Sequence, residues 1–116
     1  ENTFAVLNLN GFRLTDVSAQ NLGYDLEGID PNGDDIYIEV KSLEWQGQKF
    51  RMTNNEFAVA QIKKNKYYLA LVIQNKETIE IGLVRNPIDS LKLTRQCVQW
   101  VWECSEYEFC PIRFKI

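Results

Sequence analysis

The 116-residue sequence predicts one α/β (α+β) domain, spanning residues 1–116, in which helices flank a mixed sheet. Three observations support this fold class. Residues 34–42 alternate between apolar and polar side chains, whereas residues 67–74 form the near-continuous apolar run of a strand covered on both faces. A capped helix at residues 53–65 separates the two strands, so we expect a crossover that leaves them parallel and adjacent.

The chain opens on a helical pattern. The stretch ENTFAVLNLNGF has the pattern of the second half of a helix that ends at Asn10-Gly11. Because the chain starts without Met and inside this helix, we expect a domain cut from a longer protein, with the first helical turns in an upstream segment. Residues 12–18 and 24–30 then predict two strands joined by a short connection.

The crossover helix has a clear start signal. Residues 47–52 form a short extended piece before it, and the T-x-x-E pattern that follows places Thr53 and Glu56 in a capping box. One side of this helix is expected to carry Phe57, Ala60 and Gln61.

Further strands are predicted after the crossover. Residues 78–85 alternate and pair with the apolar run through a turn at residues 75–77, and Pro87 ends the strand. The stretches 97–103 and 110–116 predict two additional C-terminal strands. One face of the first of these, typical of a core face or a domain interface, carries Val98, Trp100 and Trp102.

Composition limits the chemistry that the chain can perform. The sequence contains no His, and its three Cys lack a C-x-x-C pair, so we expect no zinc site and no Ser-His or Cys-His nucleophile. An odd number of cysteines without a secretory signal predicts an intracellular, cytoplasmic location, or a nuclear one in a eukaryote. No apolar run is long enough to span a membrane. The net charge of −3 argues against a globally basic nucleic-acid-binding protein.

The turn between the second and third strands predicts how they pair. Its sequence DPNGD has the preferences of a type I turn followed by a left-handed Gly, the three-residue hairpin loop with a bulge. With Pro31-Asn32-Gly33 as the loop, the numbers of paired residues sum to 64. Asp25 is therefore predicted to lie directly opposite Glu39.

This pairing creates a candidate metal site. Opposed residues on antiparallel strands share a face and have Cβ atoms ~5 Å apart, so the carboxylates of Asp25 and Glu39 repel each other. A bound divalent cation removes that repulsion. Lys41 follows on the same face, and Glu27, which shares the face with Asp25, is a substitute ligand. The alternative is a solvated Asp25 beside a surface ion pair of Glu39 and Lys41.

The same residues carry a resemblance to a known family. The pattern GYD at residues 23–25 followed by IEVK at residues 38–41 resembles the D…E-x-K signature of the PD-(D/E)XK nuclease superfamily. The series GYDLEGID, YIEVKS, FRMTNNEFAVAQ and YYLALV is similar to the Mrr-like branch, specifically to the domain of unknown function at the C-terminus of NO VEIN-type proteins. The resemblance covers roughly residues 10–75. It implies a restriction-endonuclease-like αβββαβ core, here extended by C-terminal strands.

The resemblance also implies roles for the residues of the site. In that superfamily the Asp and the Glu hold Mg²⁺, for which Mn²⁺ substitutes, and the backbone carbonyl between the Glu and the Lys is a further ligand. Carried over, the ligands are Asp25, Glu39 and the carbonyl of Val40. Lys41 would orient or polarise the attacking water.

Accessory residues are implied in the same way. Some members of the superfamily carry an extra acid or Gln on flanking helices, and the positions to consider here are Glu1, Glu56 and Gln61. The capping box accounts for Glu56, and an ordinary helix surface accounts for Gln61, without a ligand role.

Two functions from different classes follow. The first is a Mg²⁺-dependent DNA endonuclease domain of a restriction or phage-defence protein, acting with other domains of a longer chain such as a helicase or an ATPase. The second is a non-catalytic DNA-binding or protein-interaction module on the same fold. The acidic net charge favours the second function, whereas the intact Asp-Glu-Lys set favours the first, which is our prediction.

Overall fold

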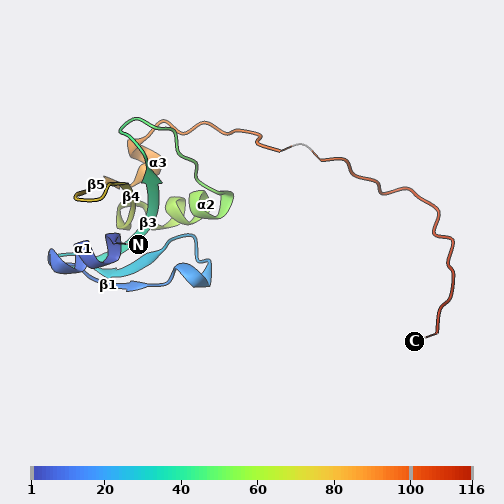
Figure 1. Cartoon of the computed structure of the whole chain (residues 1–116), viewed down its shortest axis with the longest axis horizontal. Helices are drawn as coiled ribbons and strands as arrows, with labels where there is room; N and C mark the ends of the chain where they lie inside the picture. The colour runs from blue at the N-terminus through green and yellow to red at the C-terminus, as the bar shows by residue number, and fades with distance from the viewer. Residues whose placement is uncertain (1, 100, 116) are drawn as a thin grey trace.

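Five strands form one mixed sheet in the order β1-β2-β3-β4-β5 (Figure 1). The structure, a computed structural model, describes residues 2–99 and 101–115. The strands are β1 (Arg13–Asp16), β2 (Leu26–Ile29), β3 (Asp35–Leu43), β4 (Tyr67–Gln74) and β5 (Ile79–Arg85). β3 and β4 are parallel, and the other neighbouring pairs are antiparallel. The predicted mixed α+β sheet and its parallel crossover are therefore confirmed.

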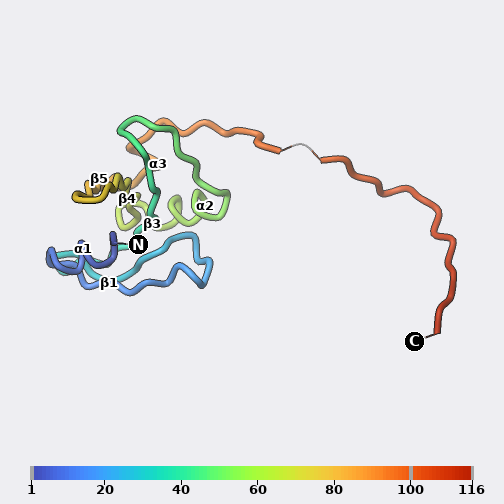
Figure 2. The backbone as a smooth tube through the Cα atoms, in the orientation of Figure 1, coloured from blue at the N-terminus to red at the C-terminus, as the bar shows by residue number. Residues whose placement is uncertain are grey.

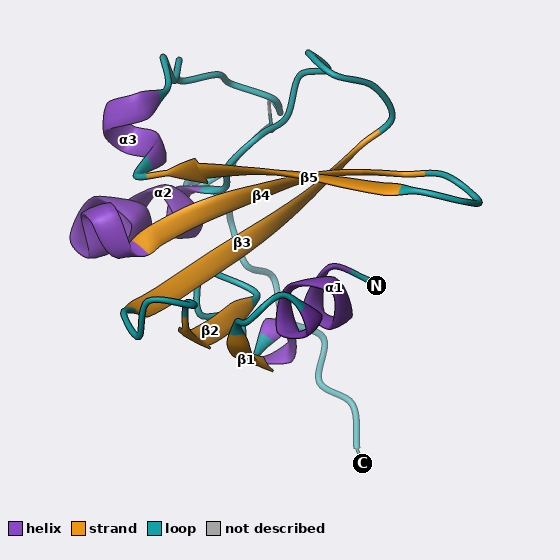
Figure 3. Ribbon diagram, turned by 90° about the vertical axis from the view of Figure 1, so that its left-hand side faces the viewer, coloured by secondary structure: helices purple, strands orange, loops and turns teal. Residues whose placement is uncertain are grey.

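Helices cover both faces of this sheet (Figure 3). They are α1 (Thr3–Leu9), α2 (Asn54–Lys63) and α3 (Pro87–Ser90), with 3₁₀ turns η1 (Ser18–Gln20) and η2 (Lys64–Lys66). α1 packs on one face, whereas α2 and α3 pack on the other. In the described part of the chain, no helix has both the length and the apolar character needed to cross a membrane.

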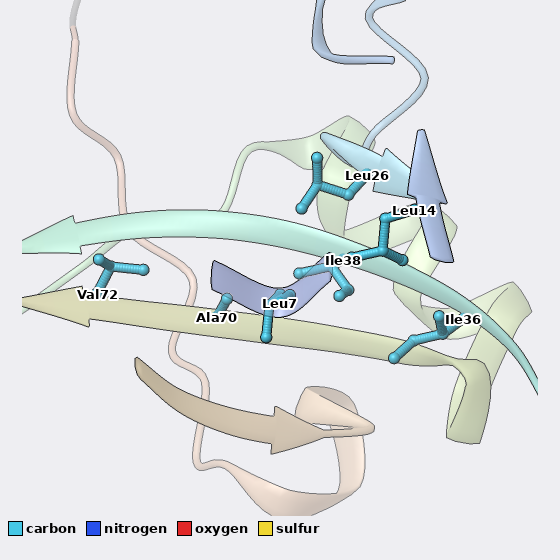
Figure 4. Close-up of a cluster of buried hydrophobic side chains, with 7 residues drawn as sticks. All are labelled: Leu7, Leu14, Leu26, Ile36, Ile38, Ala70 and Val72. Carbon is cyan, nitrogen blue, oxygen red and sulfur yellow. The ribbon is translucent and has the colours of Figure 1, made fainter. Parts of the chain in front are cut away.

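Each face of the sheet buries its own cluster of side chains. The cluster under α1 consists of Leu7, Leu14, Leu26, Ile36, Ile38, Ala70 and Val72 (Figure 4). The cluster under α2 consists of Ala60, Tyr67 and Leu69. Successive residues of β4 alternate between the two clusters, which explains why this strand is apolar along nearly its whole length.

The hairpin between β2 and β3 forms as its turn sequence predicts. The N–H of Asp30 donates to the carbonyl of Asp34 at 2.9 Å, and the N–H of Gly33 donates to the carbonyl of Asp30 at 3.0 Å. Gly33 has φ +86°, the left-handed conformation that the loop requires. The pairing of Leu26 with Ile38 confirms the predicted register.

The structure corrects which side of α2 faces the sheet. Phe57 and Gln61, expected beside Ala60 on one side, are both exposed. The inward stripe, spaced i, i+3, i+4 and i+7, consists of Glu56, Val59, Ala60 and Lys63. The apolar pattern misled because α2 covers a part of the sheet that carries charged side chains, so its own inward face is partly charged.

The predicted strands at residues 97–103 and 110–116 are wrong for the residues that the structure describes. Residues 92–99 and 101–115, here called the C-terminal arm, contain no helix or strand and run away from the sheet (Figures 1 and 2). Trp102, expected on a core face or an interface, is fully exposed. Trp100 and Ile116 lie outside the described residues. An alternating pattern makes a strand only when a neighbouring strand accepts its backbone hydrogen bonds.

Candidate functional site

A cavity of about 90 Å³ lies where the beginning of β2, the middle of β3 and the first turn of α2 meet. Three carboxylates, those of Asp25, Glu39 and Glu56, contribute to its lining. The cavity lies on the α2 face of the sheet, because the odd-numbered residues of β3 point to that face. The hairpin register therefore brings the predicted site residues together.

Asp25 is held at its place by backbone hydrogen bonds on both sides. Its N–H donates to the carbonyl of Ile38 at 2.8 Å, and its carbonyl accepts from the N–H of Val17 at 2.8 Å. The bond to Ile38 is offset by one residue from the β2–β3 register, in which Ile38 pairs with Leu26, so the direct pairing of Asp25 with Glu39 stays a prediction. Both side chains line the same cavity. The N–H of Val40 donates to Oδ2 of Asp25 at 2.9 Å, which fixes the carboxylate against β3.

The backbone of Val40 faces the same edge of β3. In an extended strand the N–H and C=O of one residue point to the same neighbour. Since the N–H of Val40 reaches the side chain of Asp25, its carbonyl is directed toward the same space beyond the first residue of β2. Val40 is not among the residues that line the cavity, so the ligand role of its carbonyl stays a prediction.

Glu39 is a buried carboxylate with other acids close by. Only 6% of the accessible surface of Glu39 is exposed. Burial first, and then the negative charges of Asp25 and Glu56, raise the pKa of Glu39 to about 8, against the opposing effect of the Lys41 ammonium. At neutral pH the ionised form of Glu39 is thus costly unless a further cation enters the cavity.

Lys41 lies half-buried between two acids. Its Nζ is 2.7 Å from Oε1 of Glu56 and 3.4 Å from Oε2 of Glu39. The ammonium therefore points toward the interior of the site rather than into bulk water, as its place on β3 predicts. The sequence predicts that Lys41 shares a face with Asp25 and Glu39, whereas in the structure its nearest acid is Glu56, on α2.

Glu56 serves the helix and the site with the same oxygen. Its Oε1 accepts from the N–H of Thr53 at 3.0 Å, completing the capping box, and from Nζ of Lys41 at 2.7 Å. Burial alone would raise the pKa of Glu56, but these hydrogen bonds from Lys41 and Thr53 lower it below its ordinary value. Sequence reasoning found the cap and assigned Glu56 to it, but the contact with Lys41 depends on how α2 packs on β3.

Tyr67 is a residue of the site that the sequence reasoning did not single out. Its ring is fully buried beneath the acids, and its hydroxyl donates to the carbonyl of Gly23 at 2.7 Å. Burial, with the nearby charges of Glu39, Glu56 and Asp25, raises the pKa of this hydroxyl. The signal in the sequence was the alternation of side chains along β4, whose odd-numbered residues, including Tyr67, lie on the same sheet face as Glu39.

Position 23, directly before Tyr24 and Asp25, requires a glycine. A Cβ at this position would lie 2.8 Å from Cγ2 of Val59, and the backbone has φ +89°. Only glycine combines this conformation with such a close approach to α2. The GYD pattern therefore marks the point at which the chain passes under α2 to deliver Asp25.

Two other candidates, Glu27 and Gln61, lie outside the cavity. Glu27 accepts a hydrogen bond from the hydroxyl of Tyr24 at 3.1 Å and does not line the cavity. Gln61 is exposed on the outer side of α2. Glu1 lies outside the described residues.

The donor set fits a hard divalent cation. It consists of carboxylate and carbonyl oxygens, from Asp25, Glu39 and Val40, and Mg²⁺ is commonly held by one or two carboxylates together with waters. Among the residues that the structure describes, no group of three or more acids or thiols is arranged to hold a metal ion. Glu56, whose carboxylate binds Lys41, is accordingly assigned to the lysine and not to the metal.

Comparison with known proteins gives one family. The sequence model of the family described as "Protein NO VEIN, C-terminal" matches residues 5–84, which is more than half of the chain. Searches of curated proteins and of solved structures gave no match.

Proposed function

We propose that this chain, which belongs to the family of protein NO VEIN C-terminal domains, is a Mg²⁺-dependent nuclease domain. Its cavity holds Mg²⁺, and the domain hydrolyses phosphodiester bonds of DNA. The observation that carries this proposal is the convergence of Asp25 and Glu39 on one cavity, with the ammonium of Lys41 3.4 Å from Oε2 of Glu39 and with Glu39 buried near two other carboxylates. A purely structural sheet gains nothing from opposed buried acids, whereas a metal site requires them.

The order of elements supports a restriction-endonuclease-like core of the PD-(D/E)XK, Mrr-like type. A helix, three antiparallel strands, a crossover helix and a parallel fourth strand follow one another from α1 to β4. The Asp lies at the start of the second strand, and the Glu and the Lys lie in the third. This is the αβββαβ arrangement that the resemblance implies.

Each residue has a role that its contacts suggest. When bound, Mg²⁺ would lower the pKa of a water and stabilise negative charge on the phosphate. The carboxylates of Asp25 and Glu39, with the carbonyl of Val40, would supply the ligands. Lys41, positioned by Glu56, would present its ammonium to the attacking water and to the charge that develops on the phosphate in the transition state.

The test is a plasmid-nicking assay with Mg²⁺ or Mn²⁺, performed on this chain and on the longer protein that contains it. We expect Asp25→Ala, Glu39→Ala and Lys41→Ala each to reduce nicking by at least about 100-fold. The matched control is Asp34→Ala, which removes a carboxylate from an exposed turn and should leave nicking unchanged.

The second candidate function is a non-catalytic DNA-binding or protein-interaction module. The observation in its favour is the net charge of −3, which gives the chain little general attraction for a phosphate backbone. If the wild-type chain and the longer protein nick no DNA and gain no thermal stability from Mg²⁺ or Mn²⁺, this second function replaces the first.

A further inference from the structure

The C-terminal arm exposes large apolar side chains that a stable protein normally covers. They are Val98, Val101, Trp102, Tyr107, Phe109, Ile112 and Phe114. The most exposed of these is Trp102, at 103% of its reference accessible area. Aromatic residues bury roughly 150–250 Å² each when covered, so this arm leaves a large apolar area in water.

The edge strand β5 presents a complementary surface. β5 is the last strand of the sheet, so in the described part of the chain no strand pairs with its outer edge. On the α1 face of the sheet, β5 carries Ile79, Ile81 and Leu83, and Leu83 is 40% exposed. An unpaired edge beside a half-covered apolar face is a template for another strand.

The arm contains a segment that matches this edge in length and pattern. Residues 97–103 span seven positions, as β5 does. Antiparallel pairing with Val98 opposite Leu83 and Trp102 opposite Ile79 places the apolar residues of both strands on one face. A shift by one residue would set Gln99 or Glu103 against the apolar residues of β5, so the alternation excludes such shifts, and this register is the one that the tests below address.

We propose that residues 97–103 of one chain pair with β5 of a second copy. The same segment of the second copy pairs with β5 of the first, so the two chains form a closed symmetric dimer. The choice of a second copy rests on two observations. The arm runs away from its own sheet instead of folding back onto it (Figure 1). Each chain also carries both halves of the complementary pair, so two copies satisfy both edges at once.

The first test is the mass of the full chain by size-exclusion chromatography with light scattering. We expect wild type to have twice the 13.6 kDa mass of one chain. Trp102→Ser in the arm and Leu83→Lys on β5 should each halve the observed mass, with unchanged circular dichroism in the folded part. Tyr107→Ser, an exposed aromatic outside the pairing segment, is the matched control and should leave the dimer intact.

The second test identifies which chain supplies the strand. Gly82 lies opposite Gln99 in the proposed register, and the space beside Gly82 accepts a Cβ. Two single-cysteine chains are prepared, Gly82→Cys and Gln99→Cys, each with its three native cysteines replaced by Ser. Mixed and oxidised, they should form a disulfide-linked dimer, which neither chain forms alone to a similar extent.

Three results would overturn the proposal. One is a wild-type chain that stays monomeric at concentrations up to about 1 mM, since a dimer weaker than that is not a specific assembly. Another is an intrachain disulfide in the double variant Gly82→Cys/Gln99→Cys, which would show that the arm folds onto its own sheet. The third is a series of open-ended oligomers instead of a closed dimer.

Discussion

Two groups of charged side chains lie along β3, one around a larger recess at the beginning of the strand and one around the smaller cavity farther along it. The recess, of about 410 Å³, lies at the beginning of β3 and is lined by charged residues that include Asp30, Asp34, Asp35, Lys66 and Arg85. The cavity, of about 90 Å³, lies farther along the strand and contains Asp25, Glu39 and Glu56.

The difference between these groups lies in burial and in what the acids bind. In the recess, Oδ1 of Asp30 accepts from the N–H groups of Asn32 and Asp34, so this carboxylate stabilises the turn. In the cavity, the carboxylate of Glu39 is buried and its pKa is raised. A cluster of charges indicates function when its members are held together out of water at a cost in stability, and not by their number alone.

The largest effect on stability that we expect is a pH dependence from Glu39. Its pKa is about 8 in the folded chain and 4.5 as the ordinary value. The folded state therefore binds the extra proton, and in EDTA the free energy of unfolding should fall by up to about 5 kcal/mol as pH rises from about 4.5 to about 8. Urea unfolding across this range measures the slope.

The controls separate Glu39 from other acids. Glu39→Gln should remove most of the slope and raise stability at pH 8, because it also relieves repulsion with Asp25 and Glu56. Asp35→Asn in the recess should keep the slope. The pKa of Glu56 is lowered in the folded chain, so this residue makes the free energy of unfolding rise with pH. That rise falls below the ordinary pKa of Glu56 and therefore below the tested pH range. A wild-type chain with constant stability over this range would contradict the account of Glu39.

Mn²⁺ should stabilise the chain through the cavity and not through the recess. At a metal concentration 100 times Kd, binding to the folded state alone adds about 2.7 kcal/mol to the free energy of unfolding. Thermal melting at pH 7.5 should show this gain for wild type and for Asp34→Asn, and its loss for Asp25→Asn. A gain that persists in Asp25→Asn but disappears in Asp34→Asn would assign the metal to the recess.

The capping role of Glu56 can be separated from its contact with Lys41 by mutation. Thr53→Ala removes the cap hydrogen bond from the N–H of Glu56 to Oγ1 of Thr53 and should cost about 1 kcal/mol of stability, while nicking activity is retained. Glu56→Gln disturbs the cap and also leaves Lys41 without its nearest anion. We expect a similar loss of stability together with a 10-fold to 100-fold loss of nicking, because Lys41 is no longer held in position. Equal nicking rates in the two variants would show that Glu56 is only a cap.

The last contrast concerns Tyr67 and affects stability alone. Tyr67→Phe removes the donor to the buried carbonyl of Gly23 and should lower the free energy of unfolding by about 1–2 kcal/mol. Tyr68→Phe, on the opposite face of the same strand, should change stability by less than about 0.5 kcal/mol. Chemical denaturation of both variants gives the comparison, and equal effects would show that the Gly23 contact has no special weight.

Much of the site could be predicted because local chemistry determines its geometry. The turn Pro31-Asn32-Gly33 specifies one β2–β3 register, and that register brings Asp25, which directly precedes β2, close to Glu39. Residues that reach the cavity from distant parts of the chain were less accessible to prediction. Glu56 approaches Lys41 only after α2 packs, and Tyr67 lies beneath the acids only because β4 pairs in parallel with β3.

The C-terminal arm shows the limit of pattern reading in a different way. Residues 97–103 alternate as clearly as β3 does, yet β3 has neighbours on both sides and the arm has none in the described part of the chain. Alternation reports which side chains would share a face. It does not report which strand, or which chain, provides the hydrogen bonds.

The central claim is that Asp25 and Glu39 hold one divalent cation, and anomalous diffraction from crystals soaked in Mn²⁺ tests it most directly. We predict one strong anomalous peak in the cavity, at ~2.0–2.3 Å from oxygens of both carboxylates and from the carbonyl of Val40. The peak should vanish in Glu39→Gln crystals soaked in the same way. Density only at the acids of the recess, or no density in the cavity at saturating Mn²⁺, would contradict the claim.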